Sequence, residues 1–250
     1  MTMYLGNKEK YSADIWAVIE QYLPNIDENT WYVEPFCGMC GLTTHVPLKN
    51  KILNDYSTPL MAYLKKIQVS VDWLPKTSSE FPINRDIYNF YRRQMEQGII
   101  NPVLAGYIGY CFSHNGMYFQ GYLGDKQSNL VERAYTSALR IHEVIQGAKL
   151  FNVSYKDLVI PENSIIVCDG PYMNTTQYKA IKEKFIHSEY FEWCRYQKDR
   201  GCHVFVCEYE IEEPRFELIY EFKRTDLIGS GGKAKKGKKH VNTYQLEEYI

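Results

Sequence analysis

Apolar residues recur at helical spacing in three parts of the chain. In the first part they lie at positions i, i+3, i+4 and i+7, which places on one helical face Ile15, Val18, Ile19 and Tyr22. Pro24 ends this predicted helix, because proline cannot continue it. The other two predicted helices are 60–69 and the amphipathic segment 188–199.

Short apolar runs alternate with these helices, and each run stops at a polar or acidic residue. They predict strands at 30–33, 51–54, 164–168 and 203–207. Alternating strands and helices indicate an α/β fold, with a largely parallel sheet that carries helices on both faces.

The middle of the chain interrupts this alternation. Residues 70–123 carry helical segments and then a Gly- and aromatic-rich stretch, 112–122, which forms either a hairpin or a loop. We therefore expect one α/β domain, made of 1–69 and 124–250, with 70–123 inserted as a subdomain. Near the carboxyl end, a Gly- and Lys-rich segment, 229–239, precedes a last predicted strand at 241–249.

Composition narrows the class of protein. The 250 residues are 45% hydrophobic and 15% aromatic, which is typical of a folded globular protein and excludes dominant disorder. No stretch approaches the ~18 apolar residues of a membrane span. The first residues lack the apolar core of a signal peptide, and seven Cys, an odd number, fit a reducing compartment, so we expect a cytoplasmic protein.

Charge gives a weaker argument. The 29 Lys and Arg against 30 Asp and Glu give a formal charge of −1, whereas proteins that bind nucleic acid are usually basic. However, the whole-chain value averages acidic regions with the Lys-rich segment 233–239, so it constrains any one surface very little.

A first candidate site follows the strand at 30–33. Glu34 and a Gly-containing loop come directly after this strand, and Asp55 closes the next strand 21 residues after Glu34. Open α/β sheets bind nucleotide-like ligands at the carboxyl ends of their strands, and an acid at this spacing accepts hydrogen bonds from ribose hydroxyls. The loop lacks the G-x-G-x-x-G pattern that cradles a pyrophosphate, which favours a nucleoside without phosphates. A tight βα turn with no ligand is the alternative.

A second candidate site, Asp169-Gly170-Pro171-Tyr172, follows the apolar strand at 164–168. The Asp169 carboxylate and the Gly170 carbonyl can each accept one hydrogen of an exocyclic amine, and Tyr172 can stack on the ring that carries it. A plain β-turn containing proline is the alternative.

The pair Cys37-x-x-Cys40 is open to a zinc interpretation, but tetrahedral zinc needs four ligands, and no second Cys pair or nearby His pair supplies them. We therefore expect no metal and interpret both cysteines as small packing residues of the loop. His187 and His203 are interpreted as structural residues.

Five short motifs occur in the order found in the Dam-like DNA adenine-N6 methyltransferase family, which this sequence resembles. They are Y-L-G-N-K at 4–8, V-E-P-F-C-G at 33–38, L-N-D at 53–55, S-Y-K-D-L at 154–158 and D-G-P-Y at 169–172. The last is similar to the family's catalytic D-P-P-Y motif. The resemblance implies a Rossmann-like fold with an inserted target-recognition subdomain, and methyl transfer from S-adenosylmethionine to adenine N6 in DNA.

The resemblance also implies roles for individual residues. The residues implied to bind the cofactor are Tyr4, Lys8, Glu34, Phe36, Cys37, Gly38, Asp55, Asp157 and Asp169. Among them Glu34 would face the methionine end, Asp55 would bind the ribose and Asp157 would bind the adenine amine. The target adenine would be held by Asp169, Gly170, Pro171 and Tyr172.

Two departures from the family pattern stand out. Gly170 replaces the first proline of D-P-P-Y, which keeps the carbonyl and removes its rigid restraint. Between Ser113 and Gly124 there is no Arg or Lys to read guanine, so the family's G-A-T-C target is not carried over. The residues predicted to contact DNA are Arg92, Arg93, Ser113, His114, Asn115, Tyr118, Gln120, Lys235, Lys236, Lys238 and Lys239.

Other functions remain open. An amine or amide of RNA adenine or protein glutamine suits the same pocket, and a DNA-binding relative impaired by Gly170 is the non-catalytic alternative. The expected partner is double-stranded DNA, with a cognate restriction enzyme as a further one and no membrane. The resemblance implies a bacterial or phage origin, and the oligomeric state is open.

Overall fold

The computed structural model describes residues 7–23, 25–124, 129–173, 185–208, 211, 213–224 and 239–246, of which 222–224 and 239–246 are described by their backbone alone. All statements about structure below refer to these residues.

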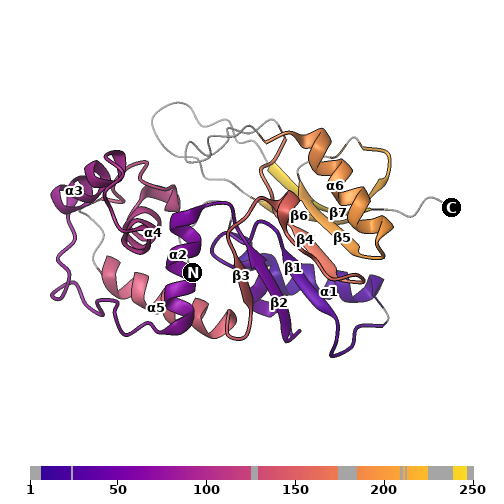
Figure 1. Ribbon diagram of the computed structural model, residues 1–250, viewed down its shortest axis with the longest axis horizontal. Coiled ribbons are helices and arrows are strands. Elements are labelled where there is room, and N and C mark those ends of the chain that lie inside the picture. The colour runs from indigo at the N-terminus through magenta and orange to yellow at the C-terminus, as the bar shows by residue number, and fades with distance from the viewer. Residues whose placement is uncertain are drawn as a thin grey trace.

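A seven-stranded sheet forms the centre of the structure, in the order β3-β2-β1-β4-β5-β7-β6 (Figure 1). The first five strands in this order are parallel to one another, and β7 runs antiparallel to both of its neighbours. The strands are β1 (Trp31–Glu34), β2 (Asn50–Asn54), β3 (Lys149–Phe151), β4 (Ile165–Cys168), β5 (His203–Glu208), β6 (Phe216–Arg224) and β7 (Lys239–Leu246). The order 3-2-1-4-5 is that of a Rossmann-like sheet, as the sequence predicts.

The helices connect these strands and are α1 (Ser12–Tyr22), α2 (Thr58–Val69), α3 (Arg85–Glu96), α4 (Pro102–Cys111), α5 (Leu130–Val144) and α6 (His187–Asp199). Four 3₁₀ turns accompany them: η1 (Glu9–Tyr11), η2 (Leu42–His45), η3 (His114–Gly116) and η4 (Tyr155–Asp157). The predicted helices correspond to α1, α2 and α6. Ser57 begins α2 as its N-cap and accepts a hydrogen bond from the backbone N–H of Leu60, and Pro59 lies in the first turn.

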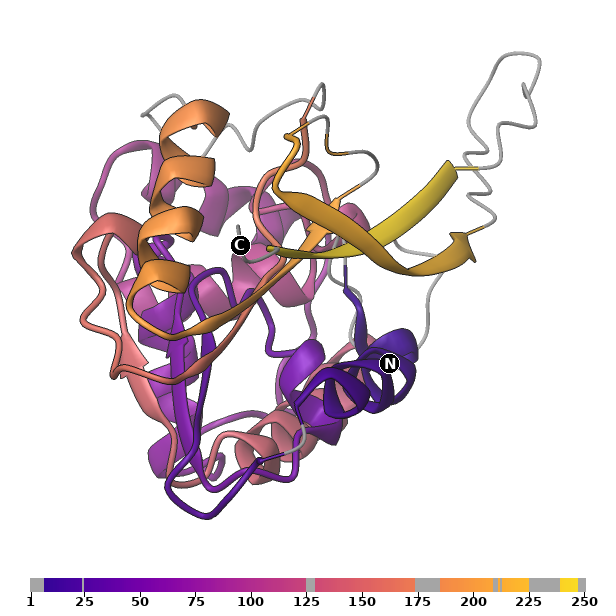
Figure 2. The ribbon, with the colours of Figure 1, turned by 90° about the vertical axis from the view of Figure 1, so that its right-hand side faces the viewer.

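Alternation along the strands separates two hydrophobic cores, one on each face of the sheet. In β4, Ile165 and Val167 belong to the core that contains α1, whereas Ile166 and Cys168 belong to the core that contains α6. Figure 2 shows α1 and α6 on opposite sides of the strands. Helices therefore cover both faces, which is why the central strands are apolar on both sides.

The region 70–123 lies to one side of the sheet. Figure 1 shows α3 and α4 furthest from the strands, with α2 and α5 between them and β3. Buried residues of this region, including Tyr88, Ile108 and Phe112, join the same core as α1 and α2. The region is thus not separated by a core of its own, and its role as a target-recognition subdomain stays a prediction.

Two strands, β3 and β6, have no counterpart among the predicted strands. The residues of β3 are exposed or half-buried, so their sequence lacks the apolar run that identifies the central strands. The last strand, β7, begins at Lys239, two residues before the predicted 241, and Lys239 therefore belongs to a strand rather than to the basic segment.

Candidate functional site

The carboxyl ends of three neighbouring strands are joined by one buried side chain, Asn54 at the end of β2. Its amide nitrogen donates to the carbonyls of Pro35 and Val153, each at 3.0 Å, and its oxygen accepts from the N–H of Val153 at 3.0 Å. The Cys37 N–H in turn donates to the Asn54 carbonyl at 2.7 Å. The segments that follow β1, β2 and β3 are thus held together as one edge.

The loop after β1 turns sharply at Gly38 and contacts Asp55. Gly38 has φ = +50°, a conformation that glycine adopts readily. Its N–H donates to Asp55 Oδ2 at 3.1 Å, and the Ser57 N–H donates to Oδ1 at 2.8 Å. Burial raises the pKa of the Asp55 carboxyl, while these two donors act in the opposite direction. The first predicted site is therefore assembled: the loop and the acid 21 residues beyond Glu34 meet.

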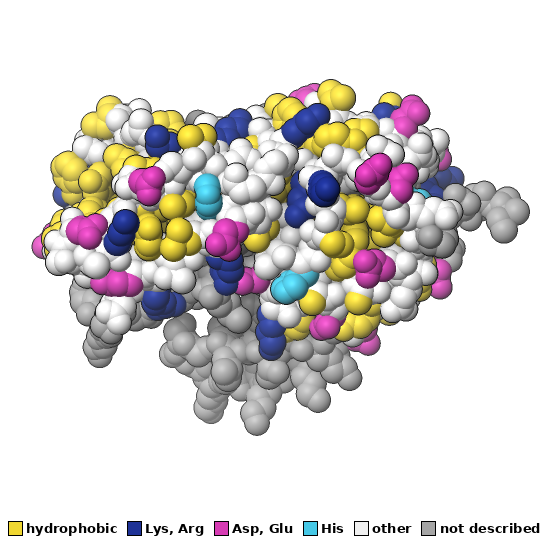
Figure 3. Space-filling view, turned by 90° about the horizontal axis from the view of Figure 1, so that it is seen from below, with side chains coloured by type: hydrophobic (Ala, Val, Ile, Leu, Met, Phe, Trp, Pro, Cys, Tyr) yellow, Lys and Arg dark blue, Asp and Glu magenta, His cyan; other side chains and the backbone are white. Residues whose placement is uncertain are grey.

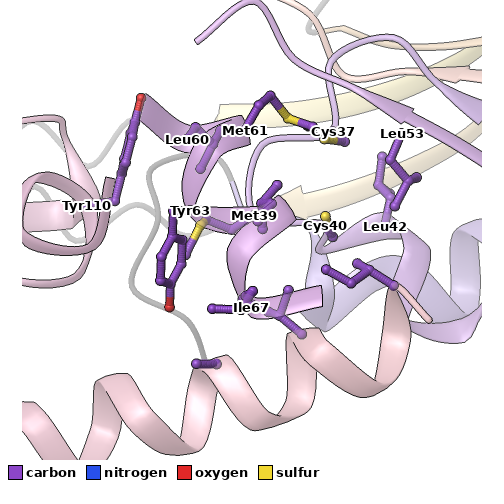
Figure 4. Close-up of a cluster of buried hydrophobic side chains, with 14 of the residues drawn as sticks. Cys37, Met39, Cys40, Leu42, Leu53, Leu60, Met61, Tyr63, Ile67 and Tyr110 are labelled. Carbon is purple, nitrogen blue, oxygen red and sulfur yellow. Dashed lines mark hydrogen bonds between the residues drawn. The ribbon is translucent and has the colours of Figure 1, made fainter. Parts of the chain in front are cut away.

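Cys37 lies in this loop but its thiol points into the core. The thiol lies 3.9 Å from Met61 Sδ, and Figure 4 shows both sulfur atoms side by side above α2. Only the backbone of Cys37 remains for a cofactor. Within the described ranges, no group of three or more His, Cys, Asp or Glu is arranged to hold a metal ion.

Glu34 is also turned inward and is almost fully buried, with 1% of its surface exposed. Its Oε1 accepts hydrogen bonds from the hydroxyl of Tyr32, at 2.8 Å, and from that of Thr43. Burial raises the pKa of Glu34 to about 7; the two hydroxyl donors oppose this rise, and the charge of Asp169 adds to it. Thr43 is a residue of this site that the sequence analysis does not single out.

The second predicted site lies directly after β4, where Asp169 has two polar partners. The Lys8 ammonium donates to Oδ1 at 2.9 Å and to Oδ2 at 3.0 Å, and the Tyr172 hydroxyl donates to Oδ1 at 2.9 Å. Lys8 Nζ also lies 5.0 Å from the centre of the Tyr172 ring. Burial raises the pKa of Tyr172 well above its usual range, so its hydroxyl stays protonated and remains a donor.

Gly170 brings the two predicted sites together. A Cβ placed on Gly170 would lie 3.3 Å from the Phe36 ring, so the turn after β4 lies against the loop after β1. The Phe36 ring is itself held among Tyr155, Phe185 and Tyr190, at centroid distances of 5.4, 5.8 and 5.7 Å. An aromatic wall therefore continues from both motifs toward η4.

Asp157, the residue predicted to bind the cofactor adenine, is the last residue of η4, and its side chain is exposed. The preceding Tyr155 is buried in the aromatic wall. Tyr4 lies outside the described residues. Asp157 is thus placed at the carboxyl side of β3, next to the edge held by Asn54.

The stretch 112–122 forms a closed loop rather than a regular hairpin. A single bridge joins Ser113 to Tyr122, and the His114 N–H donates to the Gly121 carbonyl at 2.8 Å. The side chain of Ser113 is fully buried, and its hydroxyl lies 2.7 Å from that of Tyr88. This corrects the prediction for Ser113: its hydroxyl is occupied inside the protein, so it supports the loop and cannot reach DNA.

The remaining predicted residues of this loop differ in exposure. His114, Asn115 and Gln120 are exposed, as a DNA contact requires. Tyr118 is half-buried, with its ring 5.0 Å from that of Tyr110, and burial raises its pKa to about 12. The Tyr110 hydroxyl lies 2.7 Å from Ser57 Oγ, which connects this loop to the segment that holds Asp55.

Of the predicted basic contacts, the structure describes the side chains of Arg92 and Arg93. Arg92 forms an exposed ion pair with Glu96 one turn further along α3, and Arg93 is exposed on the same helix. Lys235, Lys236 and Lys238 lie outside the described residues, as does the side chain of Lys239. On the face shown in Figure 3, positive and negative side chains are interspersed, with no broad patch of one sign.

Residues 4–222 match the family model of the D12 class N6 adenine-specific DNA methyltransferases. The chain belongs to this family. The predicted resemblance to the Dam-like family and the predicted Rossmann-like fold are therefore confirmed.

Individual relatives of this D12 class member add little. No curated protein matches the chain. Among solved structures, SMU.472, described as a candidate methyltransferase complexed with SAH, aligns over 98% of this chain at 12% identity with a TM-score of 0.36. This chain covers 53% of SMU.472, about half its length, and so low a TM-score supports no inference. No helix among the described residues is long and apolar enough to span a membrane.

Sequence analysis of the D12 class chain misses several residues that build the site. Asn54 and Thr43 act by hydrogen bonding to residues that lie 99 and 9 positions from them in the sequence, and only Asn54 lies inside a recognised motif. His187 is interpreted from the sequence as structural. Its Nε2 is hydrogen-bonded to the Pro171 carbonyl, and because a carbonyl can only accept, Nε2 of His187 carries the hydrogen and donates. No spacing in the sequence connects these two residues.

Proposed function

We propose that this protein transfers a methyl group from S-adenosylmethionine to N6 of an adenine that is flipped out of double-stranded DNA. The observation that supports this best is the group Asp169, Gly170 and Tyr172 at the end of β4, lying against Phe36 of the loop after β1. The turn after β4 suits an adenine amine, the loop after β1 suits a nucleoside, and the two segments are in contact.

The polar groups at this edge of the sheet fit S-adenosylmethionine. Asp55 is half-buried at the end of β2, where a carboxylate can accept from ribose hydroxyls, and Gly38 leaves the backbone open to close approach. The Asp169 carboxylate at the end of β4 suits a cationic ligand. Exposed Asp157 would accept from the adenine amine. When bound, S-adenosylmethionine supplies an electrophilic methyl group on a cationic sulfur.

Asp169 and its neighbours would bind the target amine. Asp169 and the Gly170 carbonyl would each accept one amine hydrogen, and the Tyr172 ring would lie against the base. This orientation directs the nitrogen lone pair out of the ring, toward the methyl group. The amine hydrogen becomes acidic only after methylation, so Asp169 need not act as a general base, and it acts mainly by orientation and by stabilising charge.

In the structure, Lys8 holds the carboxylate of Asp169 in place. Its ammonium donates to both oxygens of Asp169, so a bound adenine amine would share one of these oxygens with Lys8. The Tyr172 hydroxyl donates to Oδ1, which leaves Oδ2 with Lys8 as its single donor among the described residues. We therefore assign Oδ2 to the adenine amine.

DNA contacts come from the exposed part of the inserted region. His114, Asn115 and Gln120 would read or touch bases, and Asn and Gln side chains are suited to adenine. Arg93 and the lysines 235, 236, 238 and 239 would contact phosphates without reading sequence. Arg92 would do so after leaving Glu96.

The test is transfer of a radiolabelled methyl group to unmodified DNA, followed by digestion to nucleosides. We expect the label in N6-methyladenine, and none with the Asp169→Ala variant, whose affinity for duplex DNA should be retained. Label in cytosine, or no label in DNA, contradicts the proposal. Label in RNA or in protein glutamine instead would assign one of the alternative substrates.

A further inference from the structure

In the turn after β4, the backbone is least restrained at Gly170. Where the related motif has a proline, its ring fixes φ of that residue, whereas Gly170 carries no such restraint. Pro171 fixes its own φ, but its carbonyl and the peptide before it remain free to rotate about the other bonds. The Gly170 carbonyl, which the proposed function uses as an acceptor, therefore needs another restraint.

The structure supplies contacts at alternate residues around Gly170. Asp169 is held through its side chain by Lys8 and Tyr172. The Met173 N–H donates to Glu208 Oε2 at 3.0 Å, at the end of β5. Between these two, the Pro171 carbonyl accepts a hydrogen bond from His187 Nε2 at 2.9 Å.

Among the described residues, the bond from His187 is the one that acts on the backbone of the motif. With φ of Pro171 fixed by its ring and its carbonyl fixed by His187, both sides of Pro171 are held. The peptide that joins Gly170 to Pro171 is then held too, and with it the direction of the Gly170 carbonyl. The bonds to Asp169 restrain a side chain, and the bond to Met173 lies beyond the motif.

His187 itself is well positioned for this. It is the first residue of α6, and its ring is half-buried with its centroid 5.0 Å from that of Phe185. Phe185 also packs against Phe36, whose ring would lie 3.3 Å from a Cβ at position 170. The Phe36 ring and the His187 donor thus belong to one aromatic cluster.

We propose that His187 is a positioning residue of the methyl-transfer site. Its hydrogen bond to the Pro171 carbonyl replaces the restraint that proline at position 170 would provide, and it directs the Gly170 carbonyl at the target amine. This inference rests on the proposed function for its catalytic consequence, but not for its structural one.

The variants are His187→Ala, which removes the donor, and His187→Gln, which retains an N–H donor. The matched control is His142→Ala, because His142 Nδ1 makes the same kind of bond to the Ile67 carbonyl, at 2.6 Å, between α5 and α2. His142 is also half-buried, so both alanine variants should lose similar thermal stability.

Hydrogen exchange of the peptide that covers 165–173 is the readout that does not depend on activity. We expect faster exchange in His187→Ala, and wild-type exchange in His187→Gln and in His142→Ala. In the methyl-transfer assay, kcat should fall about tenfold or more in His187→Ala, because small misplacements of a reacting group have effects of this size. The dissociation constant of S-adenosylmethionine should stay within about twofold of wild type.

The outcomes separate the two proposals. If wild type methylates no substrate, the proposed function fails, while the exchange experiment still tests the role of His187. Unchanged exchange in His187→Ala overturns the inference. So does faster exchange that His187→Gln fails to correct, because ring packing rather than the hydrogen bond would then restrain the turn.

Discussion

The Lys8 ammonium lies 2.9 Å from Asp169 Oδ1 although 161 residues separate the two in sequence, and only 4% of the Lys8 surface is exposed. This ion pair ties the first described residues of the chain to the end of β4. Breaking a buried ion pair by removing one partner leaves a charge uncompensated.

We therefore expect Lys8→Met and Asp169→Asn each to lower the free energy of unfolding by more than a surface substitution does. Each single variant leaves one charge unpaired, whereas the double variant leaves neither. The double variant should therefore lose less stability than the two single losses added together, with a coupling energy of about 1 to 3 kcal/mol. Urea unfolding of the four proteins measures this. Strictly additive losses would show that the two charges do not stabilise each other.

Glu34 should make stability depend on pH. Its pKa is raised to about 7 from an ordinary value of 4.5, so between these values the folded protein holds a proton that the unfolded chain has released. Stability therefore falls as the pH rises through this window and is level above it. Relative to Glu34→Gln, wild type should lose about 2 to 3 kcal/mol between pH 5 and pH 8.

Glu34→Gln is a suitable reference because its amide oxygen can still accept from Tyr32 and Thr43. Urea unfolding at both pH values, with wild type and variant in parallel, gives the difference directly. A difference that is the same at pH 5 and pH 8 would mean that Glu34 is already charged in the folded protein at pH 5.

Asp55 should govern cofactor affinity. Replacing it by Ala removes the carboxylate proposed for the ribose hydroxyls and leaves the N–H groups of Gly38 and Ser57 without their acceptor. A hydrogen bond to a charged group contributes about 1.5 to 3 kcal/mol, so S-adenosylmethionine should bind about ten- to a hundredfold more weakly. Calorimetric titration measures this, with Asp72→Ala, at an exposed acid before α3, as the control.

The loop 112–122 should respond differently to changes inside it and on its surface. Ser113→Ala removes one of the two partners of the buried Tyr88 hydroxyl, leaving only the Gly121 N–H among the described residues, and should cost about 1 kcal/mol of stability. Asn115→Gly and Gln120→Ala remove exposed side chains, and glycine suits the φ of +53° at position 115, so both should alter DNA affinity or target preference with little change in stability. Fluorescence anisotropy with duplex DNA, alongside thermal unfolding, separates the two effects; a stability loss in Gln120→Ala would contradict this division.

The sequence predicts those parts of the fold whose signal is local. The central strands and α1, α2 and α6 follow from apolar spacing, and the D-G-P-Y turn follows from its motif. The edge strand β3 is missed because its residues are exposed or half-buried. Ser113 is assigned to DNA because a hydroxyl in a polar loop gives no sign that Tyr88, 25 residues earlier, lies within hydrogen-bonding distance.

Contacts between residues that are far apart in the sequence are not predicted either, because they leave no local signal. The ion pair between Lys8 and Asp169 joins residues of two motifs that lie 161 residues apart, and neither motif predicts it. His187 follows Pro171 by 16 residues, and nothing between them in the sequence predicts their bond. Motifs thus identify which residues take part, and the fold decides which of them meet.

Asn54 has a consequence for how this site can change over evolutionary time. Its amide is bonded only to backbone groups of Pro35 and Val153, so it is indifferent to which side chains those segments carry. Residues around it can therefore be exchanged, and substrate preference can drift, while the spacing between the strand ends is preserved. Asn54 itself has little such freedom, since its replacement must offer both a donor and an acceptor at the same reach.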